Sequence, residues 1–409
     1  MYLRLIAVLL ATVLVGLPAP STAETTDWPQ YRGPNRDGLS TETGLLTQWG
    51  AEGPAVAWRT KLGGGYSGLA VADGKIFTLY SDDRREWLGA FSATDGKALW
   101  QVDLDKEFTN QFGNGPRSTP LIADGVVYTV SSLGALTARK TTDGSEIWTR
   151  NLKRLYGAGI PTWGISASPI LIDGKLILDV GGSKGRGTVA FDATTGKEAW
   201  TANTGIAGYS APIEVTIAGQ RQVISFAGKQ VVGLNPTDGD VLWTHAWRTD
   251  YDVNAATPIF VGPDKVFIAS GYNVGGALLH IEKAGNAWNV DEVWKTSRMQ
   301  NQFSSAVLVD GTIYGFDNKF LRAADLASGE ILWSARGFGH GSLMWADGHL
   351  IILGDKGDLA IAKATPEGYE EVAKAKPLSG KHWTVPTLHD GRLLVRNEQE
   401  LVAFELRSK

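Results

Sequence analysis

Short apolar runs rich in β-branched and aromatic residues follow one another along most of the chain, separated by turn residues. Residues 121–123 and 126–130, for example, flank the dipeptide Asp124-Gly125. Such a dipeptide between two apolar runs predicts a β-hairpin, because both turn positions need a positive φ. No stretch after Trp28 shows sustained helical periodicity. We therefore expect an all-β protein with almost no helix.

The hairpin signal recurs along the chain, which is typical of a repeat architecture. It occurs in clear form at Asp73-Gly74, Asp124-Gly125, Asp173-Gly174, Asp310-Gly311, Asp347-Gly348 and Asp390-Gly391, and in degraded form at Ala218-Gly219 and Gly262-Pro263-Asp264. These are eight units, and each reads as four strands. A sheet of that size is barely stable alone and leaves two open edges. Packing the sheets radially around an axis buries their faces against one another. The pattern predicts an eight-bladed β-propeller.

Most units end in a tryptophan, and five of these residues come four positions after a turn glycine. Successive tryptophans are 39 to 52 residues apart, close to the length of one propeller blade. A residue that recurs from unit to unit serves the symmetry, so we predict that each indole docks on the next blade and finds a backbone acceptor for its N–H. A carbohydrate-stacking platform is the alternative, and the regular spacing argues against it. The predicted docking residues are Trp58, Trp100, Trp148, Trp200, Trp243, Trp294 and Trp333.

The two ends of the chain are expected to share one blade. The last unit has runs at 385–388, 393–396 and 401–406 but no fourth strand, and residues 56–60 carry Trp58 without a unit of their own. The N-terminal strand should therefore close the ring. The unit between Trp345 and Lys376 lacks a terminal tryptophan, which keeps a seven-bladed ring as the alternative.

The first residues have the layout of a secretory signal peptide: Arg4, an apolar run to Leu17, and small residues up to Ala23. The run is shorter than the roughly 20 residues that cross a bilayer. We therefore expect a signal peptide over 1–23 with cleavage after Ala23, an N-terminal extension over 24–54 and the propeller over 55–409. The mature chain should be a soluble monomer in the periplasm or outside the cell, with no transmembrane segment.

The composition argues against several kinds of covalent link, metal site and partner. With no cysteine, disulfides, thiolate metal sites, a haem attachment and a lipid-modified N-terminal cysteine are excluded. A net charge of -4, with the basic residues scattered, argues against nucleic acid as a partner. The 50 glycines and 15 tryptophans fit tight turns and a repeated aromatic contact.

Ser or Thr precedes Pro where the chain enters several units, as at Thr119-Pro120 and Ser168-Pro169. The innermost strands of a propeller line its axis, so residues just ahead of them should ring one mouth of the channel. Their mixture of aromatic and hydrogen-bonding side chains suits a ligand pocket, with a solvated rim as the alternative. The predicted mouth residues are Tyr66, Arg117, Trp163, Tyr209, Asn254, Gln302, His340 and His382.

Catalytic signatures are missing from the sequence. The six histidines have no metal-type pairing, no G-x-S-x-G motif occurs, and no pair of carboxylates can be placed together. We therefore predict no catalytic or metal-binding residue, and an enzyme is the less favoured reading.

The units resemble those of the PQQ-like repeat propellers, through stretches such as Ala190 to Trp200, which has the form A-x-D-x-x-T-G-x-x-x-W. The opening from Asp27 to Gly38 is also similar to the start of many exported members. The resemblance covers the chain from Trp28 onward and implies the fold more strongly than the function.

Two branches of this family suggest different functions. The quinoprotein dehydrogenases hold PQQ and Ca²⁺ at the mouth, and their pattern points here to Trp163 and Asn254, without convincing Glu and Asp partners. The BamB-type proteins are non-catalytic scaffolds of outer-membrane assembly and match in size, although they are normally anchored through a cysteine that this chain lacks. The leading hypothesis is an exported scaffold that binds a protein or peptide in the cell envelope, with no cofactor. The alternative is a small PQQ-dependent alcohol or sugar dehydrogenase with PQQ and Ca²⁺ at the mouth, and carbohydrate binding or cleavage ranks last.

Overall fold

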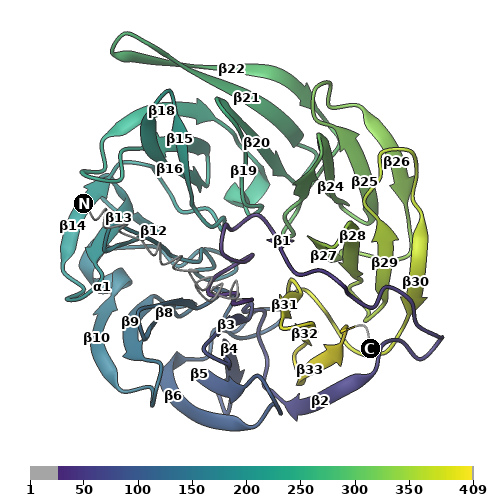
Figure 1. Cartoon of the computed structure of the whole chain (residues 1–409). Coiled ribbons are helices and arrows are strands. Elements are labelled where there is room, and N and C mark those ends of the chain that lie inside the picture. Colours follow the sequence, from purple (N-terminus) through teal and green to yellow (C-terminus); the bar gives the residue numbers. More distant parts are fainter. Residues whose placement is uncertain (1–25, 408–409) are drawn as a thin grey trace, which may run out of the picture.

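Eight antiparallel sheets of short strands stand around a central axis in the computed structural model, which describes residues 26–407 (Figure 1). The predicted eight-bladed propeller is confirmed, and the seven-bladed alternative is wrong. The predicted signal peptide lies outside the described residues. Helix is nearly absent from the described part of the chain, as expected: there is one short α-helix, α1 (Leu152–Tyr156), and one 3-10 turn, η1 (Asp250–Asp252). None of the described helices is long and apolar enough to span a membrane.

The first four blades follow one another along the chain, with the innermost strand first. Blade 1 is β3 (Ala70–Ala72), β4 (Lys75–Asp82), β5 (Arg85–Ser92) and β6 (Ala98–Lys106). Blade 2 is β7 (Leu121–Ala123), β8 (Val126–Val130), β9 (Ala135–Lys140) and β10 (Glu146–Asn151). Blade 3 is β11 (Ile170–Ile172), β12 (Lys175–Gly182), β13 (Arg186–Asp192) and β14 (Glu198–Ala202). Blade 4 is β15 (Ile213–Ile217), β16 (Gln220–Ala227), β17 (Gln230–Leu234) and β18 (Val241–Ala246).

The remaining blades complete the circle. Blade 5 is β19 (Ile259–Val261), β20 (Lys265–Ser270), β21 (Gly275–Ala284) and β22 (Ala287–Thr296). Blade 6 is β23 (Val307–Val309), β24 (Thr312–Asp317), β25 (Phe320–Asp325) and β26 (Ile331–Ala335). Blade 7 is β27 (Ser342–Ala346), β28 (His349–Leu353), β29 (Leu359–Lys363) and β30 (Glu371–Ala375), with β1 (Leu39–Ser40) added in parallel beside β27. Blade 8 is β31 (Thr387–His389), β32 (Arg392–Arg396), β33 (Glu400–Glu405) and β2 (Val56–Lys61).

The Asp-Gly dipeptides form the turns between the two innermost strands, as the sequence predicts. Asp124 and Gly125, for example, have φ values of 49° and 74°, and Ala218 with Gly219 adopts the same geometry at 48° and 73°. Both central positions are thus left-handed, which matches the right-handed twist of the strands on either side. The hydrophobic core lies between neighbouring sheets, where Leu136 of blade 2 and Leu178 of blade 3, both fully buried, belong to one cluster.

The N-terminal strand closes the ring, as predicted. β2 pairs antiparallel with β33, and Trp58 lies opposite Ala403. Arg59 donates two hydrogen bonds of 2.9 Å to the carboxylate of Glu400 across this seam. Blade 8 is therefore built from the two ends of the propeller (Figure 1).

The indole N–H groups of six tryptophans donate to backbone carbonyls of the following blade. The pairs are Trp58 with Ala93 (3.2 Å), Trp100 with Thr141 (3.2 Å), Trp148 with Ala193 (2.9 Å), Trp200 with Pro236 (3.1 Å), Trp294 with Leu326 (2.9 Å) and Trp333 with Thr365 (2.8 Å). Trp243 differs, because it donates to Oε1 of Gln222 within its own blade. In blade 5 the turn of the long β21–β22 hairpin contains Gly285, but nothing lies within 4 Å of a β-carbon added there, so this glycine does not receive the indole.

The missing tryptophan of blade 7 has a structural reason. Ala373 occupies the repeat position in β30, opposite Ile361, as Trp333 lies opposite Ala323 in blade 6. A tryptophan there would need the turn between the third and fourth strands of blade 8. That turn does not exist, because β33 and β2 come from opposite ends of the propeller. Gly53, just ahead of β2, lies near Ala375 and Pro377 instead.

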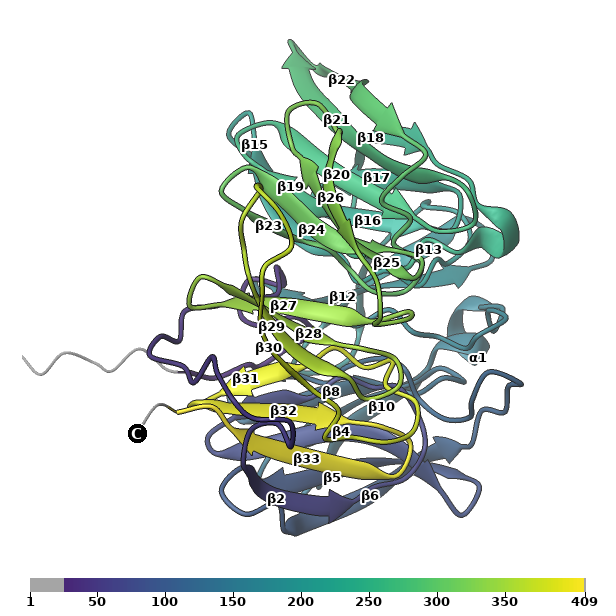
Figure 2. The ribbon, with the colours of Figure 1, turned by 90° about the vertical axis from the view of Figure 1, so that its right-hand side faces the viewer.

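The N-terminal segment ahead of β1 crosses the propeller axis before the ring begins. The carbonyl of Pro29 accepts from the N–H of Ile122 in blade 2, and Trp28 forms an antiparallel bridge with Val71 in blade 1. β1 then joins blade 7 on the other side. Figure 2 shows this segment and α1 on opposite sides of the ring. Because α1 belongs to the connection into blade 3, the loops that lead into the inner strands open on the side of α1.

Candidate functional site

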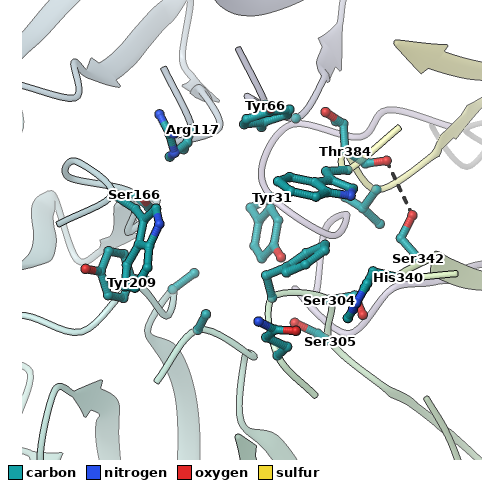
Figure 3. Close-up of a pocket in the computed structure, with 18 of the residues that line it drawn as sticks. Tyr31, Tyr66, Arg117, Ser166, Tyr209, Ser304, Ser305, His340, Ser342 and Thr384 are labelled. Atoms are coloured by element: carbon teal, nitrogen blue, oxygen red, sulfur yellow. Dashed lines mark hydrogen bonds between the residues drawn. The ribbon is translucent and has the colours of Figure 1, made fainter. Parts of the chain in front are cut away.

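The loops leading into the inner strands surround a cavity of about 470 Å³ on the axis (Figure 3). All eight blades contribute side chains to it, because each sends its innermost strand toward the same point. A cavity of this size falls within the range of small-molecule and side-chain pockets. The site is thus assembled from residues that lie far apart in the sequence.

Six of the eight predicted mouth residues line the cavity. They are Tyr66, Arg117, Trp163, Tyr209, Gln302 and His340. The structure brings them together from blades 1, 2, 3, 4, 6 and 7, as the repeat position implies. Their role in binding stays a prediction.

The positions predicted for Asn254 and His382 are wrong, since both side chains are fully buried outside the cavity. The amide of Asn254 donates to the carbonyls of Ala227 (2.8 Å) and Gly228 (3.2 Å) in the blade 4 hairpin. The His382 Nε2 lies 3.0 Å from the carbonyl oxygen of Ser379 in its own loop. Both side chains thus interact with loop carbonyls instead of facing the cavity.

Sequence reasoning also missed several aromatic residues of the lining. They are Tyr31, Phe112, Tyr272, Phe303 and Trp383. Phe303 and Trp383 are the immediate neighbours of predicted residues, so a one-residue shift in those loops would have found them. Tyr31, Phe112 and Tyr272 lie outside the repeat pattern, and no periodic signal marks them.

The aromatic residues form two groups on different sides of the cavity. We call the first the Trp163 wall: the Trp163 ring contacts Tyr209 at 5.7 Å and Tyr251 at 6.1 Å between centroids, and Tyr251 contacts Tyr272 at 6.1 Å. All three pairs are edge-to-face, the arrangement that the charge distribution of aromatic rings favours. Figure 3 shows Tyr209 of this wall across the cavity from Tyr66.

The second group, the Trp383 wall, is centred on Trp383. Its ring lies 5.3 Å from that of Tyr66 and 5.0 Å from that of Phe303, and Phe303 is 5.8 Å from the His340 ring. Burial lowers the pKa of His340, with a smaller contribution from Lys319, so its imidazole is neutral at pH 7. The cavity therefore lies between two sets of uncharged rings.

Two tyrosines of the Trp163 wall have a left-handed backbone. Tyr251 has φ 62° and Tyr272 has φ 57°, and the Tyr251 side chain is 70% exposed. This conformation is costly for bulky residues and is found mostly where function maintains it. The Tyr251 ring thus presents exposed aromatic surface beside the cavity.

The N-terminal segment closes the channel beneath the cavity. Tyr31 reaches the lining from this segment (Figure 3). Arg32 donates to the carbonyls of Ser305 (3.2 Å) and Ala306 (2.6 Å), ahead of blade 6. Arg36 donates to Ser168 (3.0 Å) and Pro169 (2.8 Å), ahead of blade 3. The two buried arginines thus fix the floor to opposite parts of the ring.

The Ser and Thr residues at the blade starts mainly connect neighbouring blades. Ser168 Oγ accepts the N–H of Thr119 at 2.9 Å, and Ser305 Oγ accepts that of Thr257 at 2.9 Å. Ser342 Oγ donates to the carbonyl of Thr384 at 3.3 Å (Figure 3). These hydroxyls line the cavity, and each makes one of these hydrogen bonds within the ring.

A family model described as outer membrane protein assembly factor BamB matches residues 84–335, more than half of the chain. The chain belongs to the BamB family. The chain is 26% identical over 315 residues to outer membrane protein assembly factor BamB of Escherichia coli (strain K12). This alignment covers 73% of this chain and 76% of that protein. The crystal structure of BamB from Moraxella catarrhalis has a TM-score of 0.59 at 13% identity, over 86% of this chain and 98% of that one, which shows a shared fold.

The BamB-family chain is also similar to quinoprotein enzymes over a shorter stretch. It is 31% identical over 178 residues to quinohemoprotein alcohol dehydrogenase of Comamonas testosteroni, covering 42% of this chain but 23% of that enzyme. The part of the enzyme outside this match is therefore much longer than the match.

The lining residues do not fit the calcium ion that accompanies PQQ in the quinoprotein branch. Ca²⁺ prefers several oxygen ligands including carboxylates, and the lining contains neither Asp nor Glu. Over residues 26–407 no group of three His, Cys, Asp or Glu side chains could hold a metal. Asn254, the expected ligand, is fully buried with its amide on loop carbonyls, so it cannot reach the cavity. We therefore derive no chemistry through this cofactor for the BamB-family chain.

Proposed function

We propose that this BamB-family chain is an exported, non-catalytic scaffold that binds a protein or peptide of the cell envelope at the mouth of its propeller. The observation that carries the proposal is the axial cavity: two aromatic walls, a fixed floor and no carboxylate in the lining. Aromatic side chains provide large, rigid contact areas and dominate the energetics of protein interfaces. The lining offers no carboxylate for general acid or base catalysis, and its one histidine, His340, packs against Phe303.

The BamB relative of Escherichia coli is an assembly factor of the outer membrane by name, which supports a protein partner and an envelope location for this chain. The predicted signal peptide supports export. The tryptophan contacts between blades support a rigid ring, in which the mouth loops are displayed with little loss of conformational freedom on binding.

Photo-crosslinking in cells tests the proposed function. A photoreactive phenylalanine derivative replaces Ala255, which lines the cavity, and in a matched control it replaces Ala98, which is exposed on outer strand β6. We expect a discrete protein adduct from position 255 and none from position 98. Adducts from neither position, or the same adducts from both, would contradict a partner site at the mouth.

A further inference from the structure

Two cationic groups lie beside the Tyr66 ring at one side of the cavity. The ammonium group of Lys381 is 5.7 Å from the centroid of this ring and 4.5 Å from that of Trp383. The guanidinium of Arg117 is 5.4 Å from the Tyr66 ring centroid. Both cations therefore sit against the Trp383 wall, where ring faces attract them.

The Lys381 ammonium keeps one donor for a ligand. It donates to the Tyr66 hydroxyl at 3.1 Å and to the carbonyl of Phe112 at 2.8 Å. A lysine ammonium has three donors, so one remains. These two hydrogen bonds also hold the side chain in one position, which lowers the entropy that an ion pair with a ligand would cost.

The carboxylates near the cavity are already engaged. Glu398 accepts the Tyr66 hydroxyl at 2.8 Å. Asp355 accepts the backbone N–H of His340 at 3.0 Å, and Asp252 lies 3.9 Å from the ammonium of Lys229. Arg117 interacts with two carboxylates, Glu86 and Glu398, and Arg396 also lies near Glu398 and Tyr66. The three cations outnumber the two carboxylates, so this side of the cavity keeps a net positive charge.

We propose that the cavity accepts an aromatic side chain of the partner peptide, and that an acidic residue next to it in the partner pairs with Lys381. This inference rests on the proposed function and specifies its ligand. A phenyl or indole ring between the two walls would continue the ring-to-ring packing seen in each of them. The absence of carboxylates from the lining and the cations at its edge disfavour a basic neighbour and favour an acidic one.

Calorimetric titration of the mature protein with short blocked peptides tests the pairing. The probe is acetyl-Gly-Ser-Glu-Phe-Gly-Ser-amide, compared with the same peptide carrying Lys or Gln in place of Glu, or Ala in place of Phe. Titrations extend to about 1 mM peptide, where weak binding is still measurable. We expect the Glu-Phe peptide to bind about three- to fivefold more tightly than the Gln-Phe peptide, as for a partly exposed ion pair. The Lys-Phe peptide should bind more weakly still, and the Ala peptide should not bind.

Protein variants locate the two halves of the interaction. Lys381→Gln should remove the preference for Glu over Gln and leave Phe binding in place, whereas Lys97→Gln, on an exposed outer turn, should change neither. Trp383→Ala should weaken every Phe peptide by at least about tenfold, as for an interface hot spot. Trp163→Ala on the other wall should do the same, which guards against misfolding of either variant alone.

The outcomes separate the inference from the function on which it rests. Equal affinities for the Glu-Phe and Lys-Phe peptides, lost together in Trp383→Ala, would overturn the acidic preference and leave the peptide-binding scaffold standing. Binding of the Ala peptide at full strength would overturn the aromatic anchor. If no peptide binds while the disaccharide cellobiose does, in a manner that Trp383→Ala abolishes, both the inference and the proposed function fail.

Discussion

The indole of Trp148 lies against Gly196 in the turn of the next blade, so closely that a β-carbon at Gly196 would be 2.5 Å from Cδ2 of the indole. The indole N–H donates to the carbonyl of Ala193 in the same blade at 2.9 Å. The glycine four residues before each tryptophan in the repeat thus belongs to the contact with the tryptophan of the preceding blade. The glycine and the tryptophan four residues after it therefore each supply one side of two successive interfaces between blades.

Replacing Gly196 by alanine tests this contact. Gly174 is a matched control, because its φ of 71° is close to the 64° of Gly196 and nothing lies within 4 Å of the added β-carbon. Both substitutions carry the cost of a left-handed alanine, about 1 kcal/mol. Gly196→Ala should cost about 1–3 kcal/mol more, because the indole must move. Urea unfolding measures the difference, and equal destabilisation would mean that the indole does not hold the blades together.

Arg36→Met should destabilise the propeller and disturb the cavity floor. The Arg36 guanidinium is buried, which lowers its pKa to about 9, and it serves the carbonyls of Ser168 and Pro169. Its loss leaves these acceptors unpaired, at a cost of at least about 2 kcal/mol. Arg298→Met, at an exposed position, should stay within about 0.5 kcal/mol of the wild type. Thermal unfolding of the two variants provides the comparison, and similar melting temperatures would refute the role of Arg36.

Asp179 should make the stability depend on pH. Burial raises its pKa to about 7, and its Oδ1 has no hydrogen-bond partner. Between about pH 4 and pH 7 the folded protein keeps a proton that the unfolded chain has released, so stability should fall as the pH rises through this range. Asp179→Asn keeps an acceptor for the N–H of Gly208 and cannot ionise, so the decline should be smaller by up to about 4 kcal/mol. Urea midpoints across the range measure the slope, with Glu367→Gln at an exposed site as the control that should leave it unchanged.

Tyr251→Gly should separate stability from binding. Glycine relieves the left-handed backbone at this position, a gain of about 1 kcal/mol that offsets the lost edge-to-face contacts with Trp163 and Tyr272. The melting temperature should therefore change little, while the affinity for an aromatic peptide falls by several-fold. Retained affinity in this variant would show that the Tyr251 ring takes no part in binding.

Titration with PQQ and Ca²⁺ tests the dehydrogenase alternative. We expect no heat of binding and no dye-linked oxidation of alcohols or sugars, because the lining has no carboxylate for the ion. Oxidation that depends on both PQQ and Ca²⁺ would make this chain an enzyme and contradict the scaffold proposal.

The fold could be predicted from the sequence because the sequence repeats. The Asp-Gly turns and the tryptophan spacing are local signals, and each has one physical solution that recurs around the ring. Trp58, without a unit of its own, revealed the closure because its position in the repeat was fixed by the others. The sequence alone does not explain Ala373. Its cause lies in blade 8, where no turn joins the third and fourth strands, β33 and β2.

The site was less readable because it is built from loops that do not repeat. The repeat pattern places Asn254 at the mouth, but in the structure its amide donates to the carbonyl of Ala227 in the blade 4 hairpin. This contact depends on the shape of that hairpin. Tyr31 reaches the cavity from a segment ahead of the propeller, held there by Arg32 and Arg36. Such long-range contacts leave no periodic trace in the sequence.

The pairing of β2 with β33 determines when the propeller ring can close during synthesis. Arg59 and Glu400, which meet across it, are 341 residues apart in the chain. In a nascent polypeptide, β2 therefore has no partner strand until nearly the whole chain has emerged from the ribosome or the translocation pore. A chain that terminates before β33 would leave β2 without its partner strand, and exposed strand edges of this kind favour aggregation.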